Sequence, residues 1–366
     1  MKFQPLLIAA VAAAVLAAAP AYAKTFKWSS ASDIPTFDIH SQNNALGNGV
    51  HAAVYDSLVY YNSRTFKVEP QLATAWREVS PTQVRFTAED VVFSLTRATA
   101  KTSNYAVYTQ GIDKVVKVND STVDIMMKGP NPVLLNQLTE LRIMSKAWAE
   151  KNKSVDPKDI RAKDETFAHR NAMGTGPYTV KEWQPDQKLV LVANPNYWGK
   201  NETNVTEIIY TPIKSEATRV AALLSGEVDL VLDPSIQDLG RLRSTGNLKV
   251  IDGVENRTIF FGMDQFRDEL PGSNIKGKNP LKDQRVRMAL YQAIDINAIN
   301  RVTMRGLSQP TGAIVAPQVN GWTEAVHKRH PYDPETSKKL LAQAGYPNGF
   351  EVDFACPNNR YINDEE

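Results

Sequence analysis

The pattern of apolar and polar positions along the chain predicts a mixed α and β structure. Segments in which apolar residues alternate with polar ones, or run together between turn signals, are typical of strands. The predicted strands are Thr25–Ser29, Val115–Val118, Thr122–Met127, Tyr178–Trp183, Lys188–Ala193, Ile208–Ile213, Val228–Leu232 and Phe350–Phe354. Asn119-Asp120 and Pro185-Asp186 are turn signals between neighbouring strands, so we expect a hairpin at each.

Apolar residues with helical spacing follow several residues that can cap a helix. The predicted helices are Asn48–Leu58 and four segments that begin after Thr87, Ser215, Asp283 and Asp333. Gly226 and Gly345 stand where two of these helices should end. The helix after Ser215 joins two predicted strands, which indicates a parallel pair with a right-handed crossover.

The first residues have the layout of a secretory signal peptide. A basic start at Lys2 precedes an apolar run, Leu6–Ala19, and the small-residue site Ala21-Tyr22-Ala23. The alternative is a membrane anchor, but the run has 14 residues and a spanning helix needs about 20. We therefore expect cleavage after Ala23 and export to the periplasm.

Composition excludes several classes of protein. The 366 residues include 42 Lys and Arg against 40 Asp and Glu, a net charge of +2, which argues against a nucleic-acid-binding surface. The hydrophobic fraction of 42% is that of an ordinary globular chain, so wholesale disorder is excluded. Cys356 is the single cysteine, so neither an intrachain disulfide nor a multi-cysteine zinc site can form.

Motifs that carry catalytic chemistry are absent or weak. The glycines of Gly47-Asn48-Gly49 are better explained as a helix start than as a dinucleotide-binding loop, because no apolar strand precedes them. His327 and His330 can share a metal, although a solvated loop explains them better, and Cys356 has no base nearby in sequence. We predict no enzyme, cofactor or metal; a secreted hydrolase stays an alternative, because a catalytic triad is assembled in space.

Six strings, in this order, resemble one family over nearly all of the chain after Ala23. They are similar to the extracellular solute-binding proteins of the dipeptide/oligopeptide/nickel class, family 5, which serve ABC importers. The strings are Val54–Val59 with Val68–Trp76, Phe86–Ser94, Gly174–Tyr178, Asn194–Gly199, Gly226–Asp229 and Arg285–Leu290.

The resemblance implies an α/β, two-lobe periplasmic-binding-protein fold with mixed sheets joined by a hinge. Lobe one would span residues 24–254, with an inserted subdomain at about 42–170, and lobe two, incomplete, residues 255–366. The implied function is to capture a peptide, nickel complex, opine or sugar by hinge closure. The closed monomer would deliver the solute to the permease and ATPase of an ABC importer.

The resemblance also implies ligand-binding residues. Peptide binders of this class treat the ligand as an added strand, so main-chain groups of the cleft segment matter. The candidates are Ser32, Asp33, Ile34, Tyr105, Tyr108, Phe261 and Met263. Each has a plainer alternative: a loop for the first three, core packing for the tyrosines, and hinge packing for the last two.

Two departures from the family pattern suggest a shortened chain. Only Arg77–Arg85 separates Trp76 from Phe86, and its turn-like centre leaves no room for the two strands expected there, so we expect an internal deletion. The chain also stops at Asn363-Asp364-Glu365-Glu366, a helix-start signal without a helix, which suggests C-terminal truncation. A non-functional fragment is therefore a further alternative.

Overall fold

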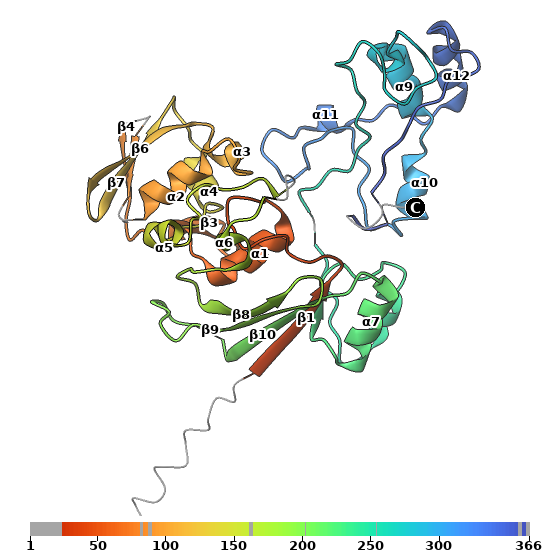
Figure 1. Ribbon diagram of the computed structural model, residues 1–366. Helices are drawn as coiled ribbons and strands as arrows, with labels where there is room; N and C mark the ends of the chain where they lie inside the picture. The colour runs from red at the N-terminus through yellow and green to blue at the C-terminus, as the bar shows by residue number, and fades with distance from the viewer. Residues whose placement is uncertain are drawn as a thin grey trace, which may run out of the picture. The chain divides into compact units, whose positions relative to one another are not determined.

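The computed structural model describes residues 24–80, 83–86, 90–160, 164–201, 203–253, 255–357 and 361–363. The predicted signal peptide, the Thr87 cap and the last three residues lie outside this part of the chain. The chain divides into two compact units, Met1–Leu232 and Asp233–Glu366 (Figure 1). The lobe boundary after residue 254 and the subdomain limits stay predictions.

A five-stranded mixed sheet forms the centre of the first unit, in the order β11-β1-β10-β9-β8. β1 is parallel to both β10 and β11, and β9 is antiparallel to β10 and β8. The strands are β1 Lys24–Ser30, β8 Tyr178–Gln184, β9 Lys188–Ala193, β10 Val205–Pro212 and β11 Leu230–Val231. The predicted hairpin β8–β9 is confirmed, whereas β10 and β11 are parallel but lie on either side of β1.

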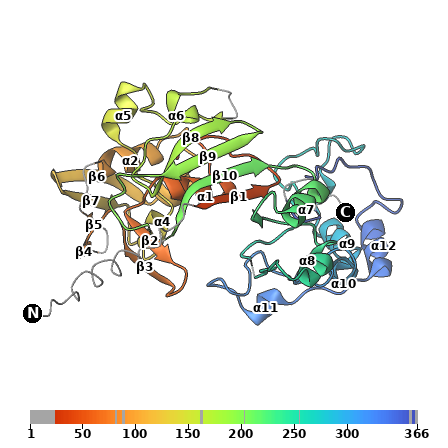
Figure 2. The ribbon, with the colours of Figure 1, turned by 90° about the horizontal axis from the view of Figure 1, so that it is seen from below.

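The helix α1, Ala45–Val54, covers one face of this sheet (Figures 1 and 2). It begins earlier than predicted, because the side chain of Asn44 accepts a hydrogen bond from the Gly47 amide at 2.7 Å and caps it. It also ends earlier, because Tyr55 is extended and fully buried in the core. That core joins α1 to the sheet through Ile34, Phe37, Ile39, Val50, Val54, Tyr55, Tyr178, Leu189, Leu191 and Tyr210.

The Gly174-Thr175-Gly176 segment crosses the end of α1 at close range. The Gly176 amide donates to the Val54 carbonyl at 2.9 Å. A Cβ at Gly174 would lie 2.1 Å from that carbonyl oxygen, and one at Gly176 2.6 Å from the carbonyl carbon. Only glycine fits at these two positions, because the backbones themselves are in contact.

A second sheet, in the order β4-β5-β7-β6, corrects the expectation that two strands cannot fit before Phe86. Two strands of four residues each suffice, which is shorter than the average length assumed but within the normal range. The strands are β4 Arg77–Ser80, β5 Gln83–Phe86, β6 Ile112–Asn119 and β7 Thr122–Met127, and a separate hairpin pairs β2 Val59–Asn62 with β3 Lys67–Pro70. The predicted β6–β7 hairpin is confirmed.

The second sheet shares a separate core with short helices. Buried apolar residues of this core include Leu58, Val91, Leu95, Val123, Ile125 and Leu138. The other α-helices in the described part of the first unit are α2 Val91–Ala98, α3 Ala106–Thr109, α4 Leu134–Leu138, α5 Lys146–Lys151, α6 Phe167–Arg170 and α7 Glu216–Ser225. In α7 the predicted cap Ser215 and the left-handed end at Gly226, φ 76°, are both confirmed.

The second unit is built from short helices and turns. They are α8 Leu239–Ser244, the 3₁₀ helix η2 Pro280–Lys282, α9 Gln284–Gln292, α10 Ile296–Arg301, α11 Glu324–His327 and α12 Pro334–Gln343. Asp283 and Asp333 cap α9 and α12 as predicted. The predicted strand Phe350–Phe354 is wrong: Val352 forms only an isolated bridge with Ser273. Alternation alone does not make a strand without a partner to pair with.

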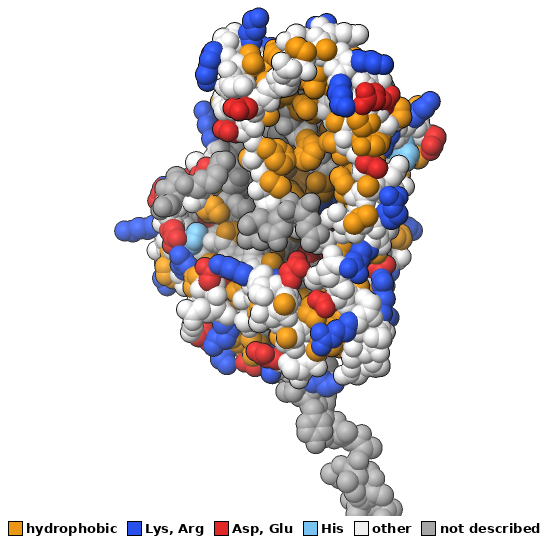
Figure 3. Space-filling view, turned by 90° about the vertical axis from the view of Figure 1, so that its right-hand side faces the viewer, with side chains coloured by type: hydrophobic (Ala, Val, Ile, Leu, Met, Phe, Trp, Pro, Cys, Tyr) orange, Lys and Arg blue, Asp and Glu red, His pale blue; other side chains and the backbone are white. Residues whose placement is uncertain are grey.

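Large apolar side chains remain exposed on the second unit, and Figure 3 shows hydrophobic side chains gathered on one face of it, in the upper part of the view. The exposed residues include Ile251, Ile259, Phe260, Phe261, Phe266, Ile314 and Phe354. Of the helices described here, none is long and apolar enough to cross a bilayer.

Candidate functional site

Four strands of the five-stranded sheet run in the same direction, so their carboxyl ends meet at one edge. These strands are β1, β8, β10 and β11. In open α/β sheets, ligands bind beyond the carboxyl ends of the strands. The segment Ser32–Ile34 follows β1 at this edge, and the turn Pro185-Asp186 follows β8.

Hydrogen bonds hold Ser32 and Asp33 against this edge. The Tyr210 hydroxyl, from β10, donates to the Ser32 carbonyl. The Asp33 carboxylate accepts from the Trp183 indole at 3.1 Å and from the Asp186 amide at 2.8 Å. Asp33 therefore joins the end of β1 to the β8–β9 turn.

Ile34 lies partly away from the edge. Its side chain is buried in the core under α1, with 2% of its surface exposed. Its amide donates to the carboxylate of the neighbouring Asp33 at 2.7 Å. The side chain of Ile34 thus anchors the segment, while Asp33 and Ser32 lie nearer the surface.

A pocket of about 380 Å³ opens beside Asp33. Its lining comes from the segment after β1, from α6 and the residues before it, and from the β8–β9 turn: Asp33, Ile34, Pro35, Ile160, Glu165, His169, Arg170, Trp183, Pro185 and Asp186. This volume suits a small solute or one group of a larger one.

The charged groups of the pocket are partly paired. Glu165 accepts from Arg170 at 3.1 Å and 3.0 Å, and its carboxylate lies 3.1 Å from Nε2 of His169. The Arg170 guanidinium also lies 5.2 Å from the centre of the Trp183 ring, within cation–π range. Asp186 is 3.8 Å from Lys214.

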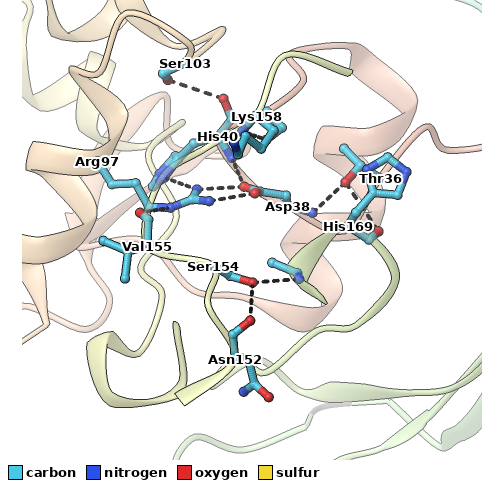
Figure 4. A network of polar contacts seen from close by, with 12 residues as sticks. Thr36, Asp38, His40, Arg97, Ser103, Asn152, Ser154, Val155, Lys158 and His169 are labelled. Atoms are coloured by element: carbon cyan, nitrogen blue, oxygen red, sulfur yellow. Dashed lines mark hydrogen bonds and ion pairs between the residues drawn. The ribbon is translucent and has the colours of Figure 1, made fainter. Parts of the chain in front are cut away.

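Behind the pocket, a buried polar network fixes the chain that follows Ile34 (Figure 4). Arg97, from α2, donates to both carboxylate oxygens of Asp38 at 2.6 Å and to the Val155 carbonyl at 2.9 Å. Asp38 and Arg97 are each 1% exposed as side chains. The network thereby ties the segment after β1 to the second-sheet part of the unit.

Two further contacts connect this network to the pocket. The Thr36 hydroxyl donates to the carbonyl of His169 at 3.3 Å, and the Phe37 amide donates to the same carbonyl at 3.0 Å. His169 lines the pocket, so the network and the pocket share α6. The position of Ser32–Ile34 is therefore set from both sides.

Burial governs the protonation of the network. Burial raises the pKa of Asp38, but hydrogen bonds and charge from Arg97 outweigh this and hold it below its ordinary value. Burial, helped by the charge of Arg97, lowers the pKa of His40 to about 3, and burial lowers that of His51 to about 4. Asp38 is therefore ionised and both histidines are neutral at pH 7.

The two tyrosine candidates lie elsewhere in the first unit. Tyr105 is buried, and its hydroxyl donates to the Asn48 side chain at 2.9 Å. Tyr108 packs on the core of the second sheet, with its ring 5.7 Å from that of Tyr105. Neither lines the pocket beside Asp33.

The last two candidates belong to the second unit. Phe261 is 55% exposed and makes an edge-to-face contact with Phe354 at 5.2 Å. Met263 packs against the small core formed by Leu270, Leu281 and Val286. Phe261 thus presents an aromatic surface, whereas Met263 is partly buried.

The two histidines that could share a metal each contact another side chain. His327 contacts the Thr311 hydroxyl at 3.2 Å, and His330 stacks edge-on with Tyr291. No group of three potential ligands occurs in the part of the chain that the structure describes. Cys356 is exposed.

Glu165, Arg170 and Trp183 line the pocket, although the sequence did not nominate them. Their separation from Asp33 along the chain hides them, because only the fold brings α6 and the β8–β9 turn to the end of β1. A signal existed for the turn: Pro185-Asp186 follows a predicted strand, and strand ends at a carboxyl edge attract ligands.

Comparison with known proteins agrees with this architecture. The chain is 28% identical to heme-binding protein A of Haemophilus influenzae over 346 residues, 84% of this chain and 59% of that protein. It is 25% identical to the dipeptide-binding protein of Escherichia coli, over 85% of this chain and 61% of that protein. The chain thus spans about three fifths of these relatives.

A solved structure has the same fold. The dipeptide-binding protein of Pseudoalteromonas sp. SM9913, in complex with Met-Leu, matches with a TM-score of 0.74 and 24% identity, over 89% of this chain and 68% of that one. The family model for the middle part of bacterial extracellular solute-binding proteins, family 5, matches residues 83–365. The two-lobe periplasmic-binding-protein fold is confirmed, and the chain belongs to the family 5 bacterial extracellular solute-binding proteins.

Proposed function

We propose that this chain is the periplasmic substrate-binding component of an ABC importer. It captures a small solute, a peptide in the first instance, by hinge closure, and delivers it as a monomer to the membrane permease and its ATPase. Cleavage after Ala23 would release it into the periplasm. It carries out no catalysis itself, in keeping with a family of solute-binding proteins.

The observation that carries this proposal is the carboxyl edge of the five-stranded sheet. Ser32–Ile34 and the β8–β9 turn meet there, and a pocket of about 380 Å³ opens beside them. The segment is held by Asp33 on one side and by the Asp38–Arg97 pair on the other. Such a preorganised edge loses little conformational entropy when a solute binds.

The names of the relatives define the solutes to test. Their names refer to heme, dipeptides and glutathione, and the solved structure holds Met-Leu. A thermal-shift screen of the purified chain against dipeptides, tetrapeptides, glutathione, heme and a nickel–histidine complex should give a rise in Tm with one class. A ligand at 100 times its Kd stabilises the folded chain by about 2.7 kcal/mol.

Isothermal titration calorimetry of each positive solute then measures the affinity directly. Saturable binding with one solute per chain supports the proposal. No shift in Tm and no heat with any of these classes would reject solute capture by this chain. Turnover of a peptide or ester substrate would instead favour the secreted hydrolase.

A further inference from the structure

We propose that the pocket beside Asp33 binds a cationic group of the solute, an ammonium or a guanidinium, with the Asp33 carboxylate as its counter-charge. This inference rests on the proposed function and specifies the chemistry of the captured solute. It is argued from the charges that line the pocket and from the partners that each charge already has.

The described residues that line the pocket carry an excess of negative charge. They include three carboxylates, those of Asp33, Glu165 and Asp186, and one guanidinium, that of Arg170. The pKa of His169 is lowered, mainly by burial, so its imidazole adds no positive charge at pH 7. A solute group that enters the pocket therefore meets a negative field.

Among the described residues that line the pocket, Asp33 is the carboxylate for which no ion pair is formed. Glu165 is paired with Arg170, and Asp186 lies near Lys214. Asp33 accepts only from uncharged donors, namely its neighbour's amide, the Trp183 indole and the Asp186 amide. No basic side chain forms an ion pair with Asp33 within the residues that the structure describes.

The hydrogen bonds of Asp33 leave room for a further donor. Two of the three donors reach Oδ2 and one reaches Oδ1, whereas an ionised carboxylate has about four acceptor positions. Those bonds also fix the carboxylate in place. A cation that enters the pocket could therefore bind to a half-buried carboxylate whose orientation is already fixed. Charge-assisted hydrogen bonds of this kind are about twice as strong as neutral ones.

Arg170 does not favour an anionic solute instead. Its guanidinium makes two hydrogen bonds with Glu165 and lies over the Trp183 ring. An incoming carboxylate would have to replace Glu165 and would meet the charge of Asp33. The Trp183 ring and Pro185 supply an apolar wall beside the cation, which suits the carbon stem of an amino acid or short peptide.

The test compares matched probes by isothermal titration calorimetry. Met-Leu carries a free ammonium at its amino terminus, N-acetyl-Met-Leu carries none, and N-acetyl-Lys-Leu carries one on a side chain. We expect the wild-type chain to prefer the ammonium-bearing probes over N-acetyl-Met-Leu by about 10- to 100-fold, the range for a hydrogen bond to a charged group. The ranking of the two ammonium probes separates a terminal from a side-chain source.

Variants assign the preference to Asp33. Asp33→Asn should remove the preference, and Asp33→Glu, which keeps the charge, should restore part of it. Asp120→Asn is the control, since Asp120 is an exposed carboxylate that pairs with Lys117 in the β6–β7 hairpin and does not line the pocket, and it should keep the preference. Urea unfolding of each variant reports whether the fold is intact.

Two failures can be told apart. Binding of all three probes with equal affinity, or a preference that survives Asp33→Asn, overturns the cation site and leaves solute capture standing. Failure to bind any of these probes or any solute of the wider screen overturns solute capture, and the cation site with it.

Discussion

At the scale of the residue, the buried Asp38–Arg97 ion pair holds in place the chain that follows the candidate binding segment Ser32–Ile34. Arg97 reaches Asp38 across 59 positions of the chain with two hydrogen bonds of 2.6 Å. Neither residue could be nominated from the sequence, because a buried pair is defined by what the fold brings together. Such a pair stabilises little overall but becomes costly when one partner is removed.

Replacement of Arg97 by methionine should therefore destabilise the chain strongly. The ionised Asp38 would stay buried without a counter-charge, so we expect a loss of about 3–5 kcal/mol in the free energy of unfolding, measured by urea denaturation. The double variant Arg97→Met with Asp38→Asn should recover part of the lost free energy of unfolding. Lys146→Met, which breaks an exposed pair with Glu150, should change stability by less than about 1 kcal/mol. Equal effects for Arg97→Met and Lys146→Met would refute this role.

The buried histidines make stability depend on pH. His40 and His51 have pKa values of about 3 and about 4 in the folded chain, against 6.5 when exposed. As pH falls below 6.5 the unfolded chain binds protons that the folded chain does not, so stability is lost in that direction. The stability that comes from keeping both histidines neutral is fully present above pH 6.5.

Between pH 7.5 and 5.5 we expect the two histidines to lower the free energy of unfolding by about 2–3 kcal/mol. Urea denaturation at pH 7.5, 6.5 and 5.5 measures this, and His51→Gln should remove about half of the loss. A stability that stays constant over this range, or that rises as pH falls, would show that these histidines are not buried in their neutral form.

At the scale of the element, local signals predicted well and long-range pairing predicted poorly. The hairpins β6–β7 and β8–β9 and the caps Ser215, Asp283 and Asp333 are short-range features, so the sequence contains all that determines them. The supposed strand Phe350–Phe354 fails, because pairing depends on a neighbour that no local pattern reveals. The pairing of the short strands β4 and β5 depends on the same long-range information, so the sequence does not predict them.

The contact between α1 and the Gly174–Gly176 segment is testable with a matched pair of glycine variants. Gly176→Ala should destabilise the chain by several kcal/mol, because its Cβ would lie 2.6 Å from the backbone of Val54. Gly49→Ala, in the exposed interior of α1 with nothing within 4 Å, should stabilise by about 0.5–1 kcal/mol.

Thermal unfolding of both variants measures the difference. If Gly176→Ala is tolerated as well as Gly49→Ala, the two segments do not touch as described. The sequence presented Gly174 and Gly176 only as part of a family string; their physical reason, the approach of two backbones, required the structure.

At the scale of the whole molecule, the second unit exposes many large apolar side chains to solvent. Phe260, Phe261 and Phe354 are each more than half exposed. Soluble proteins seldom leave such groups together in water. We therefore expect the native chain to enhance the fluorescence of the dye ANS.

Phe260→Ser combined with Phe354→Ser should lower that fluorescence markedly. Phe66→Ser is the control, because Phe66 is also exposed but lies in the turn between β2 and β3 of the first unit. Dye fluorescence that is absent in the native chain, or that falls equally with Phe66→Ser, would show that the second unit does not present this surface.

The candidate site was anticipated in part. Ser32, Asp33 and Ile34 came from the resemblance to the family, but the side-chain role of Asp33 depends on Trp183 and Asp186, which only the fold brings near. Tyr105 is packed in a core, which is its plainer alternative, whereas Met263 packs against the small core of the second unit. The sequence thus nominated the segment, and the structure shows that Ser32 and Asp33 lie nearer the surface than Ile34.

The most direct test of the account is hydrogen–deuterium exchange with and without a solute that calorimetry has shown to bind. We predict slower exchange in residues 31–34 and 184–188, at the carboxyl edge of the five-stranded sheet, and no change in the β6–β7 turn at residues 119–122. Bound solute that leaves both edge segments unchanged would contradict the placement of the site.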